Sequence, residues 1–372
     1  MSIWEVIKGK AKRKYLNATD IQVLDVANRF KHKNLERVLN EIGTGSAQSV
    51  ANLEHKVDQL GNPNLLINSD FRNPVNQRAQ TTYSDNSKYI IDRWLLVNWS
   101  DTSNSSVGNV KVIENGISLS NFDSQLYLVQ TMENDLAKKL RGRTITLSAK
   151  VKASNITKGS FFIQVNSHEV ANKIDLSNSL SSSKQVLNYK DMDKEGNILI
   201  AIPYVVPEEA ETIQVGFGCH TDIGEGMPNS DCLINVEWIK LEVGDKATPF
   251  IPRSYSEELA LCRRYFLSLN PSNDSYPTVG SCFIQNANST NTRVNINVPV
   301  EMRCFPTAIM RNGNLRVSLA NKAVAVSSLS SDQFAPSIIR FKSVISATPD
   351  EAGLFPCQID NGSDLWLDAE IY

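Results

Sequence analysis

The sequence lacks an excess of charge of either sign, and it lacks any long apolar run. Its 38 lysines and arginines nearly match its 40 aspartates and glutamates, which gives a formal net charge of −2 over 372 residues. This balance disfavours electrostatic capture of a polyanion, so we expect no nucleic-acid partner. No stretch approaches the roughly 20 consecutive apolar residues that cross a bilayer, and residues 1–15 place a short apolar patch before their basic residues. We therefore expect neither membrane insertion nor a signal peptide.

Residue types that carry catalysis or hold metals are few and poorly spaced. The six cysteines form no CxxC pair, so we expect free, mostly buried thiols in a protein made in a reducing cytosol. Residues of types that can bind a metal lie close together in one place, at Cys219, His220, Asp222 and Cys232. Their spacing is not the paired short spacing of a zinc site. No GxSxG elbow, GxxxxGK[ST] loop or complete GxGxxG motif is present, and no pair of carboxylates is singled out. We expect no enzyme activity, no cofactor and no metal.

The first 61 residues have helical periodicity, unlike the rest of the chain. A basic cluster at Lys8–Lys14 is typical of a solvated arm or a docking peptide. Thr19 and Gln22 form a capping-box pattern that predicts a helix over about 20–42. Before the break at Gly61, four apolar residues follow the a/d spacing of a coiled coil: Val50, Leu53, Val57 and Leu60. This seam predicts self-association, although an amphipathic helix packed on its own domain has the same spacing.

From Asn64 onward the apolar residues alternate, as in half-buried strands. Residues 143–151 show the pattern most clearly, and the apolar parity shifts between Trp238 and Ile239, which predicts a bulge. A second capping box at Ser254–Glu257 predicts a short helix at a domain border. We therefore predict a mainly β protein with three parts: a helical attachment and oligomerisation segment (1–61), a jelly-roll β-sandwich (62–253), and a short helix with a C-terminal β-sandwich tip domain (254–372).

Two groups of residues are candidates for contact with a ligand. Aromatic rings on a β-sandwich can serve as flat platforms for sugars, and the candidates in the first strands are Tyr83, Tyr89 and Trp99. Core packing is the competing interpretation for such rings, and we expect Trp94 to be a core residue. A polar loop of the expected C-terminal tip domain, residues 286–292, offers paired amides for glycan hydroxyls, with Asn286, Asn288 and Asn291 as candidates.

Several strings in the chain are similar to those of one protein family. They are NLLINSDF (64–71), NPVNQR (73–78) and IDRW (91–94), followed by TPFIPRSY (248–255), EELALCRRYF (257–266) and VPVEMR (298–303) with Pro306. Together they resemble the tail-fibre and receptor-binding proteins of tailed bacteriophages. The resemblance covers most of residues 62–372, and the first sixty residues match less clearly.

The resemblance implies a protein of the virion tail, assembled in the host cytoplasm, that recognises a host cell-surface receptor, commonly a glycan. It implies a homotrimer whose N-terminus docks on other tail or baseplate proteins. Valine at a with leucine at d favours two strands, so the trimer follows from the resemblance and not from the seam. It carries no catalytic motif, and Asp92, Arg93 and Trp94 are expected to fix the sandwich. Two alternatives stay open: a structural baseplate or tail component without receptor binding, and a virion-associated glycan-degrading enzyme.

Overall fold

The computed structural model describes residues 37, 39–41, 61–83, 88–98, 109–120, 125–172, 174, 179–191, 197–269, 277–335 and 337–371. It divides into two compact units, residues 1–62 and 63–372. Within the first unit, Arg37 and residues 39–41 are helical. The predicted seam of Val50, Leu53, Val57 and Leu60 lies outside the described residues, and so does the basic cluster.

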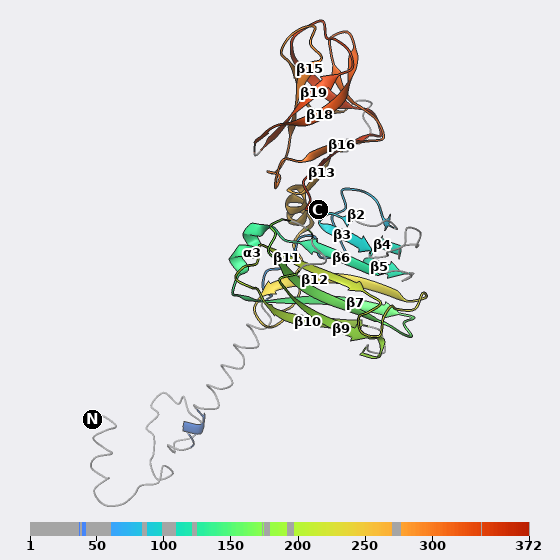
Figure 1. Ribbon diagram of the computed structural model, residues 1–372, viewed down its shortest axis with the longest axis vertical. Coiled ribbons are helices and arrows are strands. Elements are labelled where there is room, and N and C mark those ends of the chain that lie inside the picture. Colours follow the sequence, from blue (N-terminus) through green and yellow to red (C-terminus); the bar gives the residue numbers. More distant parts are fainter. Residues whose placement is uncertain are drawn as a thin grey trace, which may run out of the picture. The chain divides into compact units, whose positions relative to one another are not determined.

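Two six-stranded antiparallel sheets form a β-sandwich in the second unit, as predicted (Figure 1). The first sheet runs in the order β1 (Thr82–Tyr83), β4 (Asn109–Ile113), β5 (Gly116–Ser120), β12 (Leu233–Val243), β7 (Thr144–Ser154) and β10 (Asn197–Val205). The second runs in the order β2 (Lys88–Ile91), β3 (Trp94–Asn98), β6 (Leu126–Thr131), β11 (Thr212–Cys219), β8 (Ser160–His168) and β9 (Ser181–Asn188). The chain alternates between the sheets from β5 to β8, as in a jelly roll.

The alternation of apolar residues explains the core of this sandwich. On β7, Ile145, Leu147, Ala149 and Val151 are fully buried between the sheets. The predicted bulge on β12 is confirmed, because the register with β7 shifts between Val236 and Trp238. Helix α3 (Asn134–Leu140) follows β6, and a 3-10 turn η2 (Tyr189–Asp191) follows β9.

The outer face of the second sheet is also buried. The ring of Tyr127 lies across β11, where a Cβ on Gly216 would come within 2.3 Å of the ring. Phe162 packs beside Tyr127 with 5.6 Å between ring centroids. Ile174 and Ile223 pack on this cluster, so the rings of Tyr127 and Phe162 are not open to a ligand.

Helix α4 (Tyr255–Arg263) joins the sandwich to the C-terminal strands. It begins with the predicted capping box, in which Glu257 N donates to Ser254 Oγ (3.3 Å) and Ser254 N donates to Glu257 Oε2 (2.9 Å). The helix thereby satisfies two backbone groups at its start.

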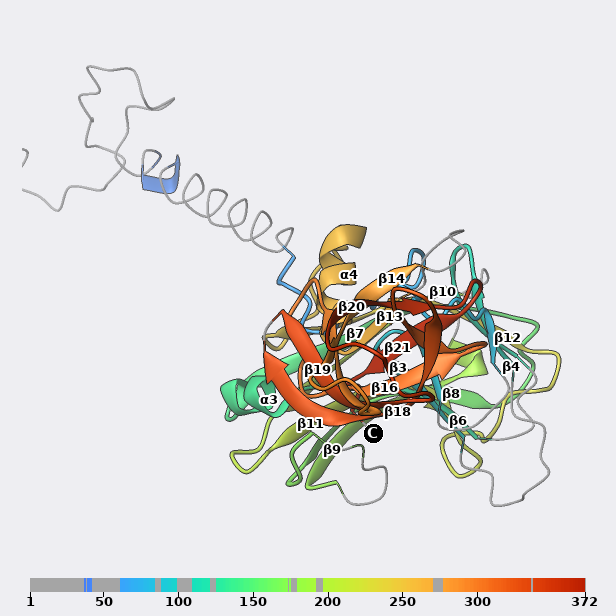
Figure 2. The same ribbon diagram turned by 90° about the horizontal axis from the view of Figure 1, so that it is seen from above.

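The C-terminal strands correct one prediction, because they form a closed barrel and not a β-sandwich. The barrel order is β14 (Thr278–Ile284), β15 (Asn291–Asn297), β19 (Ile338–Ile345), β18 (Ala323–Ala335), β17 (Leu315–Ser318) and β20 (Gly353–Ile359). A separate three-stranded sheet contains β13 (Phe266–Leu269), β21 (Asp364–Asp368) and β16 (Thr307–Arg311). Figure 2 shows β14, β18, β19 and β20 around the barrel. Closure between β14 and β20 leaves the barrel without an edge strand.

Buried ion pairs join the sandwich to the end of the chain. Arg93 Nη1 donates to Glu370 Oε2 (2.5 Å), and Arg78 Nη2 lies 3.6 Å from Glu370 Oε1. The Arg93 guanidinium lies 3.6 Å from the ring centroid of Tyr265. The IDRW string therefore has two roles. Trp94 fixes the sandwich core, while Arg93 reaches the C-terminal segment, which the prediction of a purely sandwich role missed.

All six thiols are unpaired, and five of them are buried as predicted; Cys304 is half-buried. No helix within the described part of the chain is long and apolar enough to cross a membrane.

Candidate functional site

The aromatic platforms predicted in the first strands are not available to a ligand. Tyr83 is 3% exposed and its hydroxyl donates to Gln80 O (2.7 Å). Tyr89 is 6% exposed and its hydroxyl donates to Ile371 O (2.5 Å), because the C-terminal segment covers that side of β2. The prediction was wrong for both tyrosines. Trp99 lies outside the described residues, so its role stays a prediction.

The predicted polar loop lies at one end of the barrel, where three loops meet. We call this end the apex and define it by residues 285–290, 319–322 and 346–352. Asn288 N donates to Pro349 O (2.9 Å), and Lys322 Nζ lies 3.2 Å from Asp350 Oδ2. Each loop is therefore held by a neighbour, and Figure 1 shows the barrel end far from the sandwich.

The structure brings together the three predicted asparagines at the apex and the adjoining start of β15. Asn286, Asn288 and Asn291 are exposed. Asn288 has a φ of 70°, a left-handed conformation that asparagine tolerates better than most residues. Asn286 O accepts from Ser289 N (3.3 Å), which closes the turn. The loop is ordered by its backbone, while its amide side chains face solvent.

An exposed apolar pair lies directly beside this loop. Phe283 on β14 is opposite Leu354 on β20, and they are 41% and 66% exposed. Among the aromatic side chains that the structure describes, Tyr255 and Phe283 are the exposed ones. We call Phe283 and Leu354 the wall pair, because both lie on the outer wall of the barrel.

Sequence reasoning missed the wall pair, although a signal for it is present. Cys282 and Ile284 are fully buried on either side of Phe283. In an alternating strand, the residue between two core positions points outward, and an aromatic residue there is unusual for a solvated wall. The informative feature was therefore the position of Phe283 between two core residues, more than the presence of an aromatic residue.

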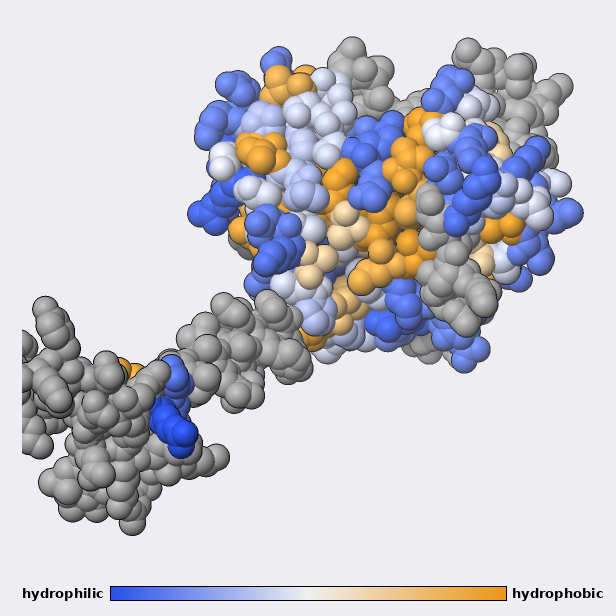
Figure 3. All heavy atoms as spheres, turned by 90° about the horizontal axis from the view of Figure 1, so that it is seen from below, coloured by the Kyte–Doolittle hydropathy of each residue, from blue (hydrophilic) through white to orange (hydrophobic). Residues whose placement is uncertain are grey.

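The underside of the sandwich carries a second exposed apolar surface. Figure 3 shows hydrophobic side chains gathered across this face. On the edge strand β10, Leu199 and Val205 are 67% and 63% exposed. Between these two residues, the outward positions of β10 are Ala201 and Pro203, which carry no hydrogen-bonding side chain.

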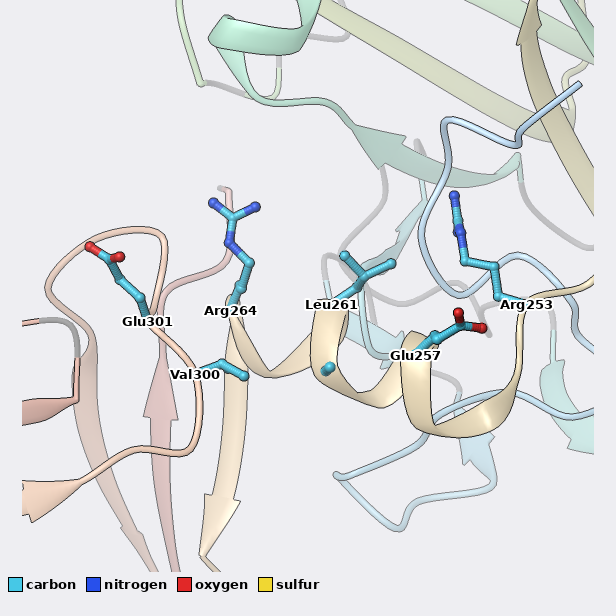
Figure 4. Close-up of a pocket in the computed structure, with 7 residues that line it drawn as sticks. Arg253, Glu257, Leu261, Arg264, Val300 and Glu301 are labelled. Carbon is cyan, nitrogen blue, oxygen red and sulfur yellow. The ribbon is translucent and has the colours of Figure 1, made fainter.

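A hollow lies beside α4 (Figure 4). Leu261 and Val300 line its floor, with charged residues around them. Three of its four charged residues already serve the fold: Arg253 pairs with Glu258 (2.9 Å), Glu257 belongs to the capping box, and Arg264 lies 3.3 Å from Glu133.

The residues of metal-ligand type do not form a site. His220 Nδ1 accepts from Asp222 N (3.0 Å) at the end of β11. Burial raises the pKa of the Cys219 and Cys232 thiols to about 12, which disfavours the thiolate that binds a metal. Within the described residues, no group of three or more histidines, cysteines or carboxylates is arranged to hold a metal ion.

Comparisons with known proteins give only remote similarities. No family model matches the chain, and no curated protein matches its sequence. Among solved structures, TmCBM61 in complex with β-1,4-galactotriose is 11% identical, with coverage of 49% of this chain and 99% of that one and a TM-score of 0.26. The tandem CBM22 domain of Paenibacillus barcinonensis Xyn10C is 8% identical, with coverage of 84% and 98% and a TM-score of 0.27.

A phage protein is also among the similar structures. The enzymatically active domain of bacteriophage CBA120 tailspike protein 4 is 13% identical, with coverage of 49% of this chain and 21% of that one and a TM-score of 0.27. Similarities of this size support no functional conclusion for this chain. The evidence for function therefore comes from the exposed residues of this chain.

Proposed function

We propose that this protein binds a glycan at the apex and outer wall of its barrel. The observation that carries the proposal is the wall pair, Phe283 and Leu354, beside the amide-bearing loop 285–290. An aromatic face packs against the apolar C–H face of a sugar ring. Amide groups both donate and accept hydrogen bonds, as sugar hydroxyls require. The two kinds of group lie side by side and face solvent.

The biological role that we propose is attachment of a tailed phage to its host. The support is the resemblance of residues 62–372 to phage receptor-binding proteins. In this role, residues 1–61 dock on a tail or baseplate protein, and the barrel faces outward. A homotrimer repeats a weak glycan contact three times, which raises avidity through effective concentration. We propose that the protein acts by binding and has no enzymatic step.

The test is glycan binding by matched variants of the full chain. Phe283→Ser and Leu354→Ser remove the wall pair, and Tyr255→Ser removes an aromatic ring of similar exposure (48%) far from the apex. On an array of bacterial surface glycans, we expect each wall variant to weaken binding about tenfold, equivalent to about 1.4 kcal/mol. Tyr255→Ser should bind like the native protein.

Each alternative predicts a different outcome. A structural tail component binds no glycan on the array and no host cell. A glycan-degrading enzyme releases reducing sugar from the glycans that it binds. Equal binding by Phe283→Ser and native protein would place the glycan site elsewhere on the molecule.

A further inference from the structure

The wall pair belongs to a longer row of side chains that crosses the barrel. Antiparallel pairing sets Leu354 opposite Phe283, Phe283 opposite Arg293, and Arg293 opposite Lys342. The residues on either side of Arg293, which are Thr292 and Val294, are buried. The four side chains therefore share the outer wall, with two apolar members followed by two cationic ones.

The cationic half of this row is short of carboxylates. Arg340 also lies on the outer wall, because it is paired with Asn295, two residues along β15 from Arg293. Asp332 Oδ2 lies 3.3 Å from Arg293 Nε and 3.1 Å from Arg340 Nε. Lys342 is exposed, and no carboxylate of the described residues lies within 4.0 Å of its ammonium group. Among the described residues, two of the three cations thus share one carboxylate, and the third has none within 4.0 Å.

The position of Asp332 keeps its two arginines in place. The register between β18 and β19 shifts between Ser331 and Gln333, so Asp332 is the extra residue of a bulge. Its side chain is 13% exposed, and those of Arg293 and Arg340 are 38% and 33% exposed. Asp332 lies beside Nε of each arginine, and Arg293 Nη1 also donates to Gln285 Oε1 (3.4 Å), so the guanidinium groups are oriented while remaining partly exposed. An oriented guanidinium loses less entropy when it binds an anion.

The acidic residues of the apex that lie near this row contact other residues of the apex. Asp350 lies 3.2 Å from Lys322 Nζ, and Glu351 Oε1 accepts from Ala320 N (3.3 Å). Both residues precede β20, on the Leu354 side of the row. On the other side of the row, Asp332 is the one described carboxylate paired with Arg293 and Arg340, so a surplus of positive charge remains there.

We infer that this row selects an anionic saccharide, with a sugar ring on Phe283 and its carboxylate or phosphate group at Arg293 and Lys342. The inference deepens the proposed function and rests on it. Guanidinium groups bind carboxylates and phosphates through paired, charge-assisted hydrogen bonds, and lysine adds a point charge. A neutral glycan keeps the contact with the wall pair and gains nothing from the two cations.

The experiment uses the full chain and matched probes. Oligomers of galacturonic acid, the same oligomers after carboxyl reduction, and poly(glycerol phosphate) are added to an array of acidic and neutral bacterial glycans. We expect the bound members to carry carboxylate or phosphate, and carboxyl reduction to weaken binding about fivefold or more. The carboxylate and phosphate probes show which anion is preferred. Binding of the acidic glycans should also weaken as the salt concentration is raised from 0.05 to 0.5 M, because salt screens exposed charges.

Variants of the row separate this inference from the proposed function. Arg293→Gln and Lys342→Gln should each reduce binding of acidic glycans about fivefold and leave neutral ones unchanged. Lys190→Gln on the sandwich, where Lys190 pairs with Glu225 (3.1 Å), is the matched control. Tight binding of neutral glycans that depends on Phe283 would overturn the anion preference and leave the proposed function standing. Binding of no glycan at all would overturn both.

Discussion

Arg93 is a buried charge whose partner comes from the far end of the chain. Its side chain is 2% exposed and that of Glu370 is fully buried. Removing one member of a buried ion pair leaves the other charged and desolvated, which costs about 3–5 kcal/mol. We predict that Arg93→Leu lowers the free energy of unfolding by that amount in urea titrations.

Arg72→Leu provides the control for this prediction. Arg72 pairs with Asp70 (2.7 Å), but its side chain is 38% exposed. Exposed pairs contribute about 0–1 kcal/mol, so this variant should unfold nearly as the native protein does. Equal stability of Arg93→Leu and Arg72→Leu would contradict a structural role for the IDRW string.

Asp92 gives this buried cluster a pH dependence. Burial raises the pKa of Asp92 to about 7, while Arg78 and Gln77 act in the opposite direction. The folded protein therefore binds this proton more tightly than the unfolded chain, whose aspartate pKa is about 4. The stabilisation is fully present below pH 4 and is lost as the pH rises through 7.

We predict that the melting temperature rises as the pH falls from 8 to 6, and that Asp92→Asn reduces this slope. Thermal unfolding followed by circular dichroism measures both. An unchanged slope in the asparagine variant would assign the pH dependence to other groups.

At the scale of elements, β11 shows why one strand carries two outward glycines. A Cβ on Gly216 would lie 2.3 Å from Tyr127 Cζ, and a Cβ on Gly218 would lie 2.2 Å from Leu126 O. The three atoms nearest to a Cβ on Gly216 all belong to the tyrosine side chain, whereas the nearest atom to a Cβ on Gly218 is a backbone oxygen. The glycines allow the ring to lie flat over the strand.

This geometry predicts a double-mutant result. Gly216→Ala should destabilise the protein by about 1–3 kcal/mol through overpacking. In the background of Tyr127→Leu, the same substitution should cost much less, because the conflicting ring is absent. If the double variant loses as much unfolding free energy as the two single variants together, the assigned contact would be contradicted.

Local patterns predicted the elements well, because each signal lies within a few residues. The alternation at 143–151 corresponds to β7, the parity shift corresponds to the bulge on β12, and the capping box begins α4. Barrel closure was not predicted, because the pairing of β14 with β20 depends on residues far apart in the chain.

The candidate site was predicted only in part, for a related reason. The amide composition of loop 285–290 marked an exposed turn, whereas alternation alone does not say which face of a strand a distant segment covers. Tyr89 was misjudged because Ile371 covers it. The row of Phe283, Arg293 and Lys342 depends on strand pairing that no local pattern contains.

At the scale of the whole molecule, we predict a parallel homotrimer with Val50, Leu53, Val57 and Leu60 facing its axis. Fewer than two heptads cannot hold an assembly alone, so Leu53→Asp with Val57→Asp should loosen the stem and leave the trimer partly intact. Light scattering of the full chain gives its mass. A monomer at micromolar concentration would contradict the trimer, and a dimer would show that the Val/Leu pattern of the seam determines the state.

Attachment to the particle is a separate prediction for the same segment. Deleting residues 1–42 should leave soluble protein that no longer joins the virion. Purified particles that contain the truncated chain at the native level would show that another region docks on the tail.

The central claim is that the barrel, and not the sandwich, binds the glycan. A crystal structure of the full chain with the tightest-binding array glycan tests it most directly. We predict that a sugar ring lies on Phe283 and Leu354, with its anionic group at Arg293 and Lys342. A sugar bound on the sandwich, with the barrel wall unoccupied, would contradict the claim.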